Sequence, residues 1–206
     1  MQEIDQLYRI RHSLAHLLAK AVLDVYPDAK PTVGPPTDSG FYYDFDFGNQ
    51  EVSENDLKKI QKQMKKTLSS WKVFQPLPIT AKKARTIFAD NQYKLELIDT
   101  IESEGEDITI YYSGPEVDNL SVDDLSTLPK NGFYDLCRGG HVENPAEDIS
   151  VKSFKLDNLA GAYWRGDASN PQLTRIYGLA FETVEELDNF LLQREEAKKR
   201  DHRKLG

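Results

Sequence analysis

The histidines and the single cysteine of this chain fall into two pairs with the same spacing. His12 and His16 are four residues apart, and so are Cys137 and His141, which together use three of the four histidines and the one cysteine. Three histidines and one cysteine could hold Zn²⁺ in a tetrahedral site. They could equally line a pocket that positions a water molecule without a metal, and the spacing alone leaves both interpretations open.

The first pair is predicted to lie on a helix over residues 5–26, which Pro27 ends. Residues four apart on a helix project from the same side, so both imidazoles would face one space. Apolar residues gather on the opposite side, around Leu14 (Leu7, Ile10, Leu17, Leu18, Ala21 and Val25). The histidine side also carries the small residues Ala15 and Ala19, which would leave room for a ligand above the helix.

The second pair lies in the segment Asp135-Leu-Cys-Arg-Gly-Gly-His141. Gly139 and Gly140 disfavour a helix, so we expect a tight loop that leaves a strand over residues 133–136. The HExxH pattern of metalloproteases is absent from the first pair, because Ser13 follows its first histidine.

The elements that must position these pairs are strands and helices in alternation. Period-two patterns predict strands over residues 40–47, 93–97, 108–112, 133–136, 151–156, 162–164 and 173–177, with 93–97 and 108–112 joined across an acidic turn. Ser53 and Asp56 are expected to open a helix that extends through Trp71 and stops before Pro76 and Pro78, and a shorter helix is expected after Thr80. The fold class predicted is α+β, with a mainly antiparallel sheet packed with helices.

The last predicted helix begins at a capping pair, Thr183 with Glu186, and its apolar side disappears after Leu191. From Arg194 onward it is nearly all charged, which is typical of a connector. We therefore expect one domain over residues 1–192, followed at 193–206 by the start of a linker helix towards a catalytic domain that is absent from the chain.

Composition excludes several classes of protein. The chain has 206 residues, one cysteine and a formal net charge of −8, so neither a disulfide framework nor a protein that coats nucleic acid non-specifically is indicated. No apolar run approaches a membrane span and the N-terminus lacks a signal-peptide layout, so we expect a cytoplasmic protein with no membrane partner.

Residues 58–85 hold nine basic residues and no acid, whereas residues 95–129 hold ten acids and no base. Two solvated faces explain this pattern most simply, and a basic edge that meets a polyanion, with the acidic lobe pointing away, is the alternative.

Several segments strongly resemble the editing domain of bacterial threonyl-tRNA synthetases, which alanyl-tRNA synthetases and free-standing editing factors share. These segments are Arg11-His-Ser-Leu-Ala-His-Leu-Leu18, Gly34-Pro35 leading into Gly40-Phe-Tyr-Tyr-Asp-Phe45, Asp135-Leu-Cys-Arg-Gly-Gly-His141, Gly161-Ala-Tyr-Trp-Arg-Gly-Asp167 and Leu173-Thr-Arg-Ile-Tyr-Gly178. The resemblance covers the chain from Tyr8 to Gly206. One departure is Gly140, where many relatives have proline.

The resemblance implies an aminoacyl-tRNA deacylase, which hydrolyses seryl-tRNA misacylated on the threonine tRNA, within a parent threonine–tRNA ligase. Serine and threonine differ by one methyl group, a difference worth only ~1–3 kcal/mol in a binding pocket, so a second sieve is needed. The resemblance places His12, His16, Lys94, Asp135, Cys137 and His141 in the editing pocket. Because no acyl-enzyme is required, Cys137 is interpreted as a pocket wall or ligand, and not as a nucleophile.

The partner implied is the aminoacylated 3′ end of tRNA, with the fragment monomeric and the parent homodimeric. We expect that no cofactor is required, although His12, His16, Cys137 and His141 could form a zinc set as in alanyl-type relatives. A cation such as Lys94 near the site would disfavour Zn²⁺ and favour direct binding of an oxyanion. Two alternatives are a free-standing editing factor of alanyl type and a zinc-stabilised module that binds tRNA without hydrolysis.

Overall fold

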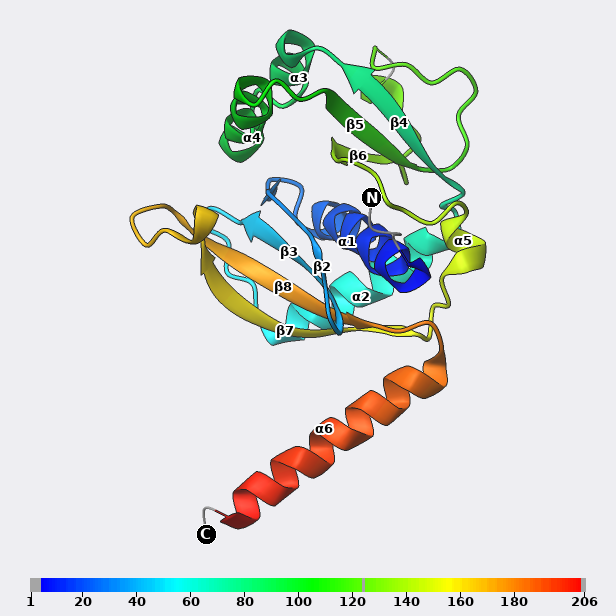
Figure 1. Ribbon diagram of the computed structural model, residues 1–206, viewed down its shortest axis with the longest axis vertical. Helices are drawn as coiled ribbons and strands as arrows, with labels where there is room; N and C mark the ends of the chain where they lie inside the picture. The colour runs from blue at the N-terminus through cyan, green and yellow to red at the C-terminus, as the bar shows by residue number, and fades with distance from the viewer. Residues whose placement is uncertain (1–4, 124, 205–206) are drawn as a thin grey trace.

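Two antiparallel sheets lie on opposite sides of the first helix in the computed structural model, which describes residues 5–123 and 125–204 (Figure 1). The larger sheet has the order β1-β3-β8-β7, with β2 also paired to β3, and the smaller sheet has the order β4-β5-β6. The strands are β1 (Lys30–Pro31), β2 (Pro36–Thr37), β3 (Gly40–Asp46), β4 (Val73–Ile79), β5 (Ile108–Gly114), β6 (Phe133–Leu136), β7 (Phe154–Tyr163) and β8 (Gln172–Ala180). The antiparallel pairing and the surrounding helices confirm the α+β class.

The first helix, α1 (Gln6–Val25), is buried on nearly every side. Asp5 caps its N-terminus, because the carboxylate accepts a hydrogen bond from the Tyr8 backbone N–H at 2.6 Å. The predicted apolar side is confirmed around Leu14, which packs with β3 and α2 (Glu54–Leu68). Ala15 and Ala19, on the histidine side, are fully buried as well, while His12 and His16 line a cavity, so the predicted room for a ligand is present. The histidine side of α1 faces the smaller sheet, and a helical wheel of α1 alone cannot show this contact.

Leu14 provides the test of this packing. Leu14→Ala is expected to lower the free energy of unfolding by about 2–5 kcal/mol, because the truncated side chain leaves a cavity at a fully buried position. Leu192→Ala is the matched control, since Leu192 is 57% exposed on the last helix. Thermal or urea unfolding would measure both variants, and equal stability of the two would contradict the position of Leu14 in the core.

The second helix and the strand after it differ from the prediction. The capping box at Ser53 and Asp56 is confirmed, but α2 ends at Leu68, and Trp71 lies beyond it with its indole N–H donating to the Asn131 carbonyl at 2.8 Å. Pro76 and Pro78 do not merely end a helix, because both lie within β4. Proline lacks the N–H that a central strand needs, and β4 accommodates two prolines because it is an edge strand that pairs only with β5.

The segment predicted as a strand over residues 93–97 is helical. It forms the start of α4 (Gln92–Ser103), whose N-cap Asn91 accepts hydrogen bonds from the backbone N–H groups of Tyr93 and Lys94. Five residues that alternate are too few to separate a strand from a helix, and the cap decided between them. The predicted hairpin with residues 108–112 is therefore wrong, and β5 pairs with β4 and β6 instead.

The second half of the chain completes the larger sheet. One strand, β7, replaces the two strands predicted over residues 151–156 and 162–164, and it pairs with β8 through a register shift between Leu156 and Leu159. Short helical turns occur at η1 (Leu125–Thr127), α5 (Pro145–Asp148) and η2 (Trp164–Gly166). On β3, the predicted alternation is confirmed for Phe41, Tyr43 and Phe45, which are buried. Asp44, on the opposite face, is buried as well because Arg175 of β8 pairs with it at 2.7 Å.

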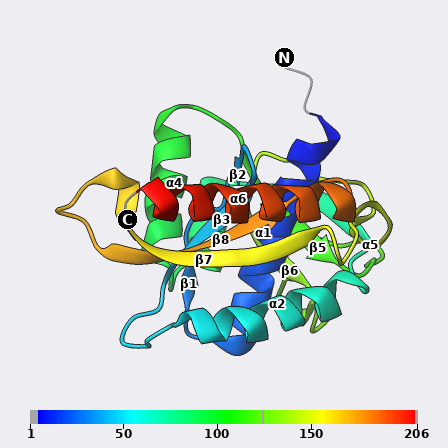
Figure 2. The same ribbon diagram turned by 90° about the horizontal axis from the view of Figure 1, so that it is seen from below.

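The last helix, α6 (Val184–Lys204), is continuous across the predicted boundary at residue 192. Its predicted capping box is confirmed, since Thr183 and Glu186 exchange hydrogen bonds. Among the α6 side chains that the structure describes, Leu187 alone is buried, and the helix runs beneath the larger sheet and away from the rest of the fold (Figures 1 and 2). Within residues 5–123 and 125–204, no helix is both long and apolar enough to cross a membrane.

Eight of the nine basic residues of the run lie on two helices with different surroundings, and Lys72 lies between these helices. On α3 (Ala81–Ile87), which begins after Thr80 as predicted, Lys83 pairs with Asp123 and Arg85 pairs with Asp99 at 2.6 Å. The alternative in which the acidic lobe points away from the basic edge is therefore wrong for α3. The lysines of α2 form a separate group on a helix that packs against α1 and β7.

Candidate functional site

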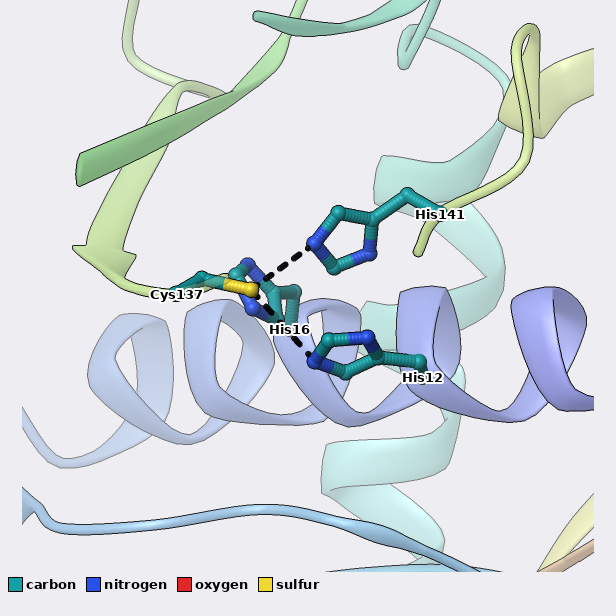
Figure 3. Close-up of side chains that lie close together, drawn as sticks. All are labelled: His12, His16, Cys137 and His141. Carbon is teal, nitrogen blue, oxygen red and sulfur yellow. Dashed lines mark hydrogen bonds between the residues drawn. The ribbon is translucent and has the colours of Figure 1, made fainter. Parts of the chain in front are cut away.

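Four side chains from the two sequence pairs converge between α1 and the loop after β6 (Figure 3). The sulfur of Cys137 lies 3.5 Å from His12 Nε2 and 3.2 Å from His141 Nε2. One ligand atom from each of these residues and from His16 lies within 4.8 Å of all the others. The structure thus brings together residues that are up to 129 positions apart in the chain.

Local backbone geometry places each pair. His12 and His16 project from successive turns of α1, and their rings lie 5.4 Å apart. The predicted loop after β6 is observed, with Gly139 at φ 90° and Gly140 at φ 87°. These angles favour glycine, and φ 87° lies far outside the range of proline. The backbone N–H of Gly139 also donates to the Cys137 sulfur at 3.2 Å.

Aromatic rings hold the imidazoles in place. The ring of His141 stacks between Phe74 of β4, at a centroid distance of 4.0 Å, and His12, at 4.2 Å. His16 is 3% exposed and meets Phe74 and Phe133 edge-on at 5.7 Å. The edge strand β4, which the prediction missed, therefore contributes directly to the site.

Burial keeps these groups neutral. It lowers the pKa of His12 and that of His16, and it lowers the pKa of His141 to about 2. It also raises the pKa of the Cys137 thiol to about 12. Neutral imidazoles can accept a proton from water, whereas a thiol with so high a pKa is a poor nucleophile.

The pKa of His141 predicts acid sensitivity. Below its ordinary pKa of about 6.5 this group is protonated in the unfolded chain but stays neutral when folded, so the unfolded state binds more protons and stability falls as pH falls. Between pH 7.5 and pH 5, His141 is expected to contribute a loss of about 2 kcal/mol. Urea unfolding at both values should show this loss reduced in His141→Phe, which cannot titrate. An identical pH dependence in the variant would contradict the burial of this imidazole.

A second group of buried polar side chains lies beside the histidines. Lys94 and Asp135 form an ion pair in which both side chains are at most 5% exposed. The ammonium also donates to the Thr32 carbonyl at 2.6 Å and to the Tyr43 hydroxyl at 3.3 Å, and the hydroxyl donates to Asp135. Burial and the Asp135 charge raise the pKa of Tyr43 well above its ordinary value, so its hydroxyl keeps the proton that it donates.

This arrangement revises the argument from Lys94. The sequence suggested a cation near the site, and the structure adds that Asp135 balances the charge of Lys94. Tyr43 and Thr32 are parts of the site that the sequence analysis does not include. The alternation of residues 40–47, which contains Tyr43, is explained by a half-buried strand alone. Ser113 was missed too, although its hydroxyl lies 3.3 Å from His16 Nδ1. The sequence carries no signal for the contact of Tyr43 with Lys94 or for that of Ser113 with His16, since the partners in each contact lie on elements that are distant along the chain.

A cavity of about 650 Å³ opens onto both groups. Five of the six candidate residues line it, namely His12, His16, Lys94, Asp135 and Cys137, while His141 lies behind the His12 ring. Residues 32–36, part of α4 and Arg138 also belong to the wall, together with Tyr8, Tyr43, Asp107, Thr109 and Leu136. The cavity therefore offers neutral bases next to a buried ammonium, which suits activation of a water and stabilisation of a developing oxyanion.

The four converging residues fit Zn²⁺ in the type of their donor atoms, and a tetrahedral site would need those atoms about 3.3–3.8 Å apart. The hydrogen-bond partners around these four residues fit a metal site less well than the donor atoms do. Histidines that bind a metal usually donate their other ring N–H to an acceptor, yet His12 Nδ1 and His141 Nδ1 are buried without a hydrogen-bond partner among the described residues.

Comparison with known proteins identifies relatives of the whole chain. Residues 108–177 match the family described as "Threonyl and Alanyl tRNA synthetase second additional domain". The chain is 45% identical over 202 residues to a threonine–tRNA ligase of Borreliella burgdorferi, a match that covers 98% of this chain and 31% of the relative. It is also 46% identical over 206 residues to the threonine–tRNA ligase of Thermotoga maritima, covering 99% of this chain and 28% of that protein. The chain thus spans about a third of the length of the curated relatives that it matches.

Proposed function

The chain belongs to the family of the threonyl and alanyl tRNA synthetase second additional domain, and on that basis we propose that it is an aminoacyl-tRNA deacylase. Its substrate in this proposal is seryl-tRNA misacylated on the threonine tRNA, and its parent protein is a threonine–tRNA ligase. The observation that supports deacylation best is the cavity in which neutral imidazoles adjoin the buried Lys94–Asp135 pair.

The reaction needs a water and no enzyme nucleophile. His12, which lines the cavity with a lowered pKa, takes a proton from a water molecule as the water oxygen attacks the ester carbonyl. The bond between the acyl carbon and the ribose oxygen then breaks, and the proton on His12 passes to that ribose oxygen. The products are free serine and a tRNA with a 3′-terminal hydroxyl group. Cys137, whose pKa is raised to about 12, serves as a wall of the pocket.

Lys94 has the role of stabilising the oxyanion. All three of its N–H bonds are directed at Asp135, Thr32 and Tyr43, and the longest contact is the one to the Tyr43 hydroxyl at 3.3 Å. A substrate oxygen would replace this weakest contact, while Asp135 and Thr32 hold the ammonium in position. His12, His16, Cys137 and His141 would hold a zinc ion if one were bound, and the ion would polarise a water only if one of the four left it an open position.

Hydrolysis of two substrates tests the proposal. The chain is expected to deacylate Ser-tRNA(Thr) much faster than Thr-tRNA(Thr), measured as loss of labelled amino acid from the same tRNA. Binding of both without hydrolysis above the buffer rate would contradict the proposal and favour the binding module. Faster hydrolysis of Ser-tRNA(Ala) would favour the free-standing editing factor of alanyl type.

Metal removal gives a separate prediction. Because two of the three imidazoles lack an outer-shell partner, we expect protein purified without added metal to contain far less than one zinc per chain. Its deacylation rate should not change with EDTA. Elemental analysis with rates before and after chelation would measure this, and stoichiometric zinc with activity lost to EDTA and restored by zinc would contradict the metal-free mechanism.

The remaining parts of the proposal concern the parent protein. We propose that residues 193–206 continue α6 as a connector from the editing domain at 1–192, because the described part of that stretch has no buried side chain. The 3′ end of tRNA is the proposed partner. Ligase activity is proposed for the parent from the names of its relatives, and dimerisation and a cytoplasmic location stay proposals for the parent.

A further inference from the structure

A second cavity, of about 530 Å³, adjoins the cavity of the candidate site. Val33, Leu97 and Thr100 belong to the walls of both, so the two cavities form one groove along α4. The first cavity is lined by His12, His16 and Lys94, and the second ends at the turn between β7 and β8, which lies beside α4 in both views of the fold (Figures 1 and 2). Any molecule that is longer than the first cavity can continue into the second.

An exposed aromatic ring and an arginine form the outer wall of this groove. Tyr163, at the end of β7, is 45% exposed, although most large apolar side chains of the described chain are buried. Arg165 follows it in η2, and its side chain is also 45% exposed. An exposed tyrosine next to an arginine is a surface on which a nucleobase can stack while its phosphate meets a cation.

The turn that carries these residues is held firmly. Arg165 has φ 54°, a left-handed conformation that costs a non-glycine residue energy. Its Nη2 donates to Thr100 Oγ1 at 2.9 Å, and the Trp164 indole N–H donates to Glu96 at 2.7 Å, so α4 holds the turn in place. These bonds and the Nε contact with Glu96 leave Arg165 Nη1 without a partner among the described residues.

The inner wall of the same groove is flat and electrically balanced. The guanidinium of Arg175 lies 3.8 Å from the centroid of the Tyr42 ring, and both its Nε and Nη2 bond to Asp44. Because Asp44 takes both of these bonds, Arg175 offers a stacking surface. Arg165 pairs with Glu96 through a single and longer contact, Nε to Oε2 at 3.6 Å, so its guanidinium is the one that a phosphate can meet.

We propose that this groove binds the single-stranded 3′ end of tRNA, with the nucleotides that precede the terminal adenosine. Tyr163 stacks on a base, and Arg165 contacts a phosphate. The inference rests on the proposed function, because an ester seated beside His12 and Lys94 requires the rest of the strand to leave the first cavity. The shared wall at Val33, Leu97 and Thr100 makes the second cavity the continuation of that path.

Two substrates separate this groove from the catalytic site. One is Ser-tRNA(Thr), and the other is the seryl ester of adenosine, which lacks the preceding nucleotides. With tRNA, Tyr163→Ala is expected to lower kcat/KM between about 5- and 150-fold, and Tyr163→Phe to retain most of it, because a phenyl ring still stacks. Arg165→Gly removes the guanidinium and suits φ 54°. It is expected to reduce the slope of log kcat/KM against log salt by about 0.7, as loss of one phosphate contact to a single strand does.

Rates on the seryl ester of adenosine decide how a loss of kcat/KM on tRNA is interpreted. Tyr163→Ala and Arg165→Gly should hydrolyse it as wild type does, and the controls Leu192→Ala and Arg200→Ala, both exposed on α6, should match wild type on both substrates. Unchanged rates on tRNA would overturn the inference. Equal losses on both substrates would overturn it too, because the turn would then act through α4 and Lys94.

Failure of the proposed function is distinguishable from failure of the groove. If wild type hydrolyses neither substrate, the deacylase proposal fails, and the affinity for uncharged tRNA(Thr) then tests the groove directly. Weaker binding by Tyr163→Ala with unchanged binding by Leu192→Ala would support the inference, and equal binding by both would overturn it.

Discussion

Replacing His12 by alanine is expected to lower kcat for deacylation by about 10²–10⁴-fold while the chain keeps its fold. His12 is the partly exposed imidazole that lines the cavity, and burial keeps it neutral at pH 7, so it can accept the proton of the attacking water. Its ring touches His141 and the Cys137 sulfur and lies outside the main apolar core. Deacylation rates and thermal unfolding on the same preparation would measure both effects.

His16→Ala serves as the comparison for this variant. His16 is 3% exposed, packs on Phe74 and Phe133 and contacts Ser113, so its loss should reduce stability as well as activity. An equal fall in melting temperature for both variants would show His12 to be structural. Retention of the full rate in His12→Ala would remove it from the reaction.

Replacing Lys94 by methionine is expected to abolish deacylation and to lower the free energy of unfolding by about 3–5 kcal/mol. The substitution preserves most of the side-chain volume but leaves Asp135 buried without its cation. The Asp135 carboxylate would still accept hydrogen bonds from the Tyr43 hydroxyl and from the Leu136 backbone N–H, which do not balance its charge.

The double variant Lys94→Met/Asp135→Asn separates the two roles of the pair. An amide at residue 135 carries no charge to desolvate, so the double variant should regain most of the lost stability and none of the activity. Urea unfolding and deacylation of Ser-tRNA(Thr) would measure the cycle. Recovery of activity along with stability would show that Lys94 only balances Asp135, and that another group stabilises the oxyanion.

Much of the fold could be predicted where the signal is local. The helix over residues 5–26, the capping boxes at Ser53 and Thr183 and the strand before Cys137 all follow from patterns within one element, and all are confirmed. The wrong predictions come from local patterns that leave out a neighbouring helix cap or the place of a strand in its sheet. Residues 93–97 alternate as a strand does, yet the Asn91 cap makes them helical, and the prolines of β4 are tolerated because that strand lies at an edge.

The sequence by itself determined which side chains lie on the same side of a helix or on the same turn. Spacing placed His12 and His16 on one side of a helix, and two glycines placed Cys137 and His141 on one tight turn, because backbone geometry over four residues needs no information from elsewhere. Only the tertiary structure decided that the two pairs meet, that Phe74 and Ser113 enclose them, and that Asp135 and Tyr43 take up the charge of Lys94. These contacts join residues up to 129 positions apart, and their energy comes from burial and desolvation, which exist only after the sheets have packed on both sides of α1.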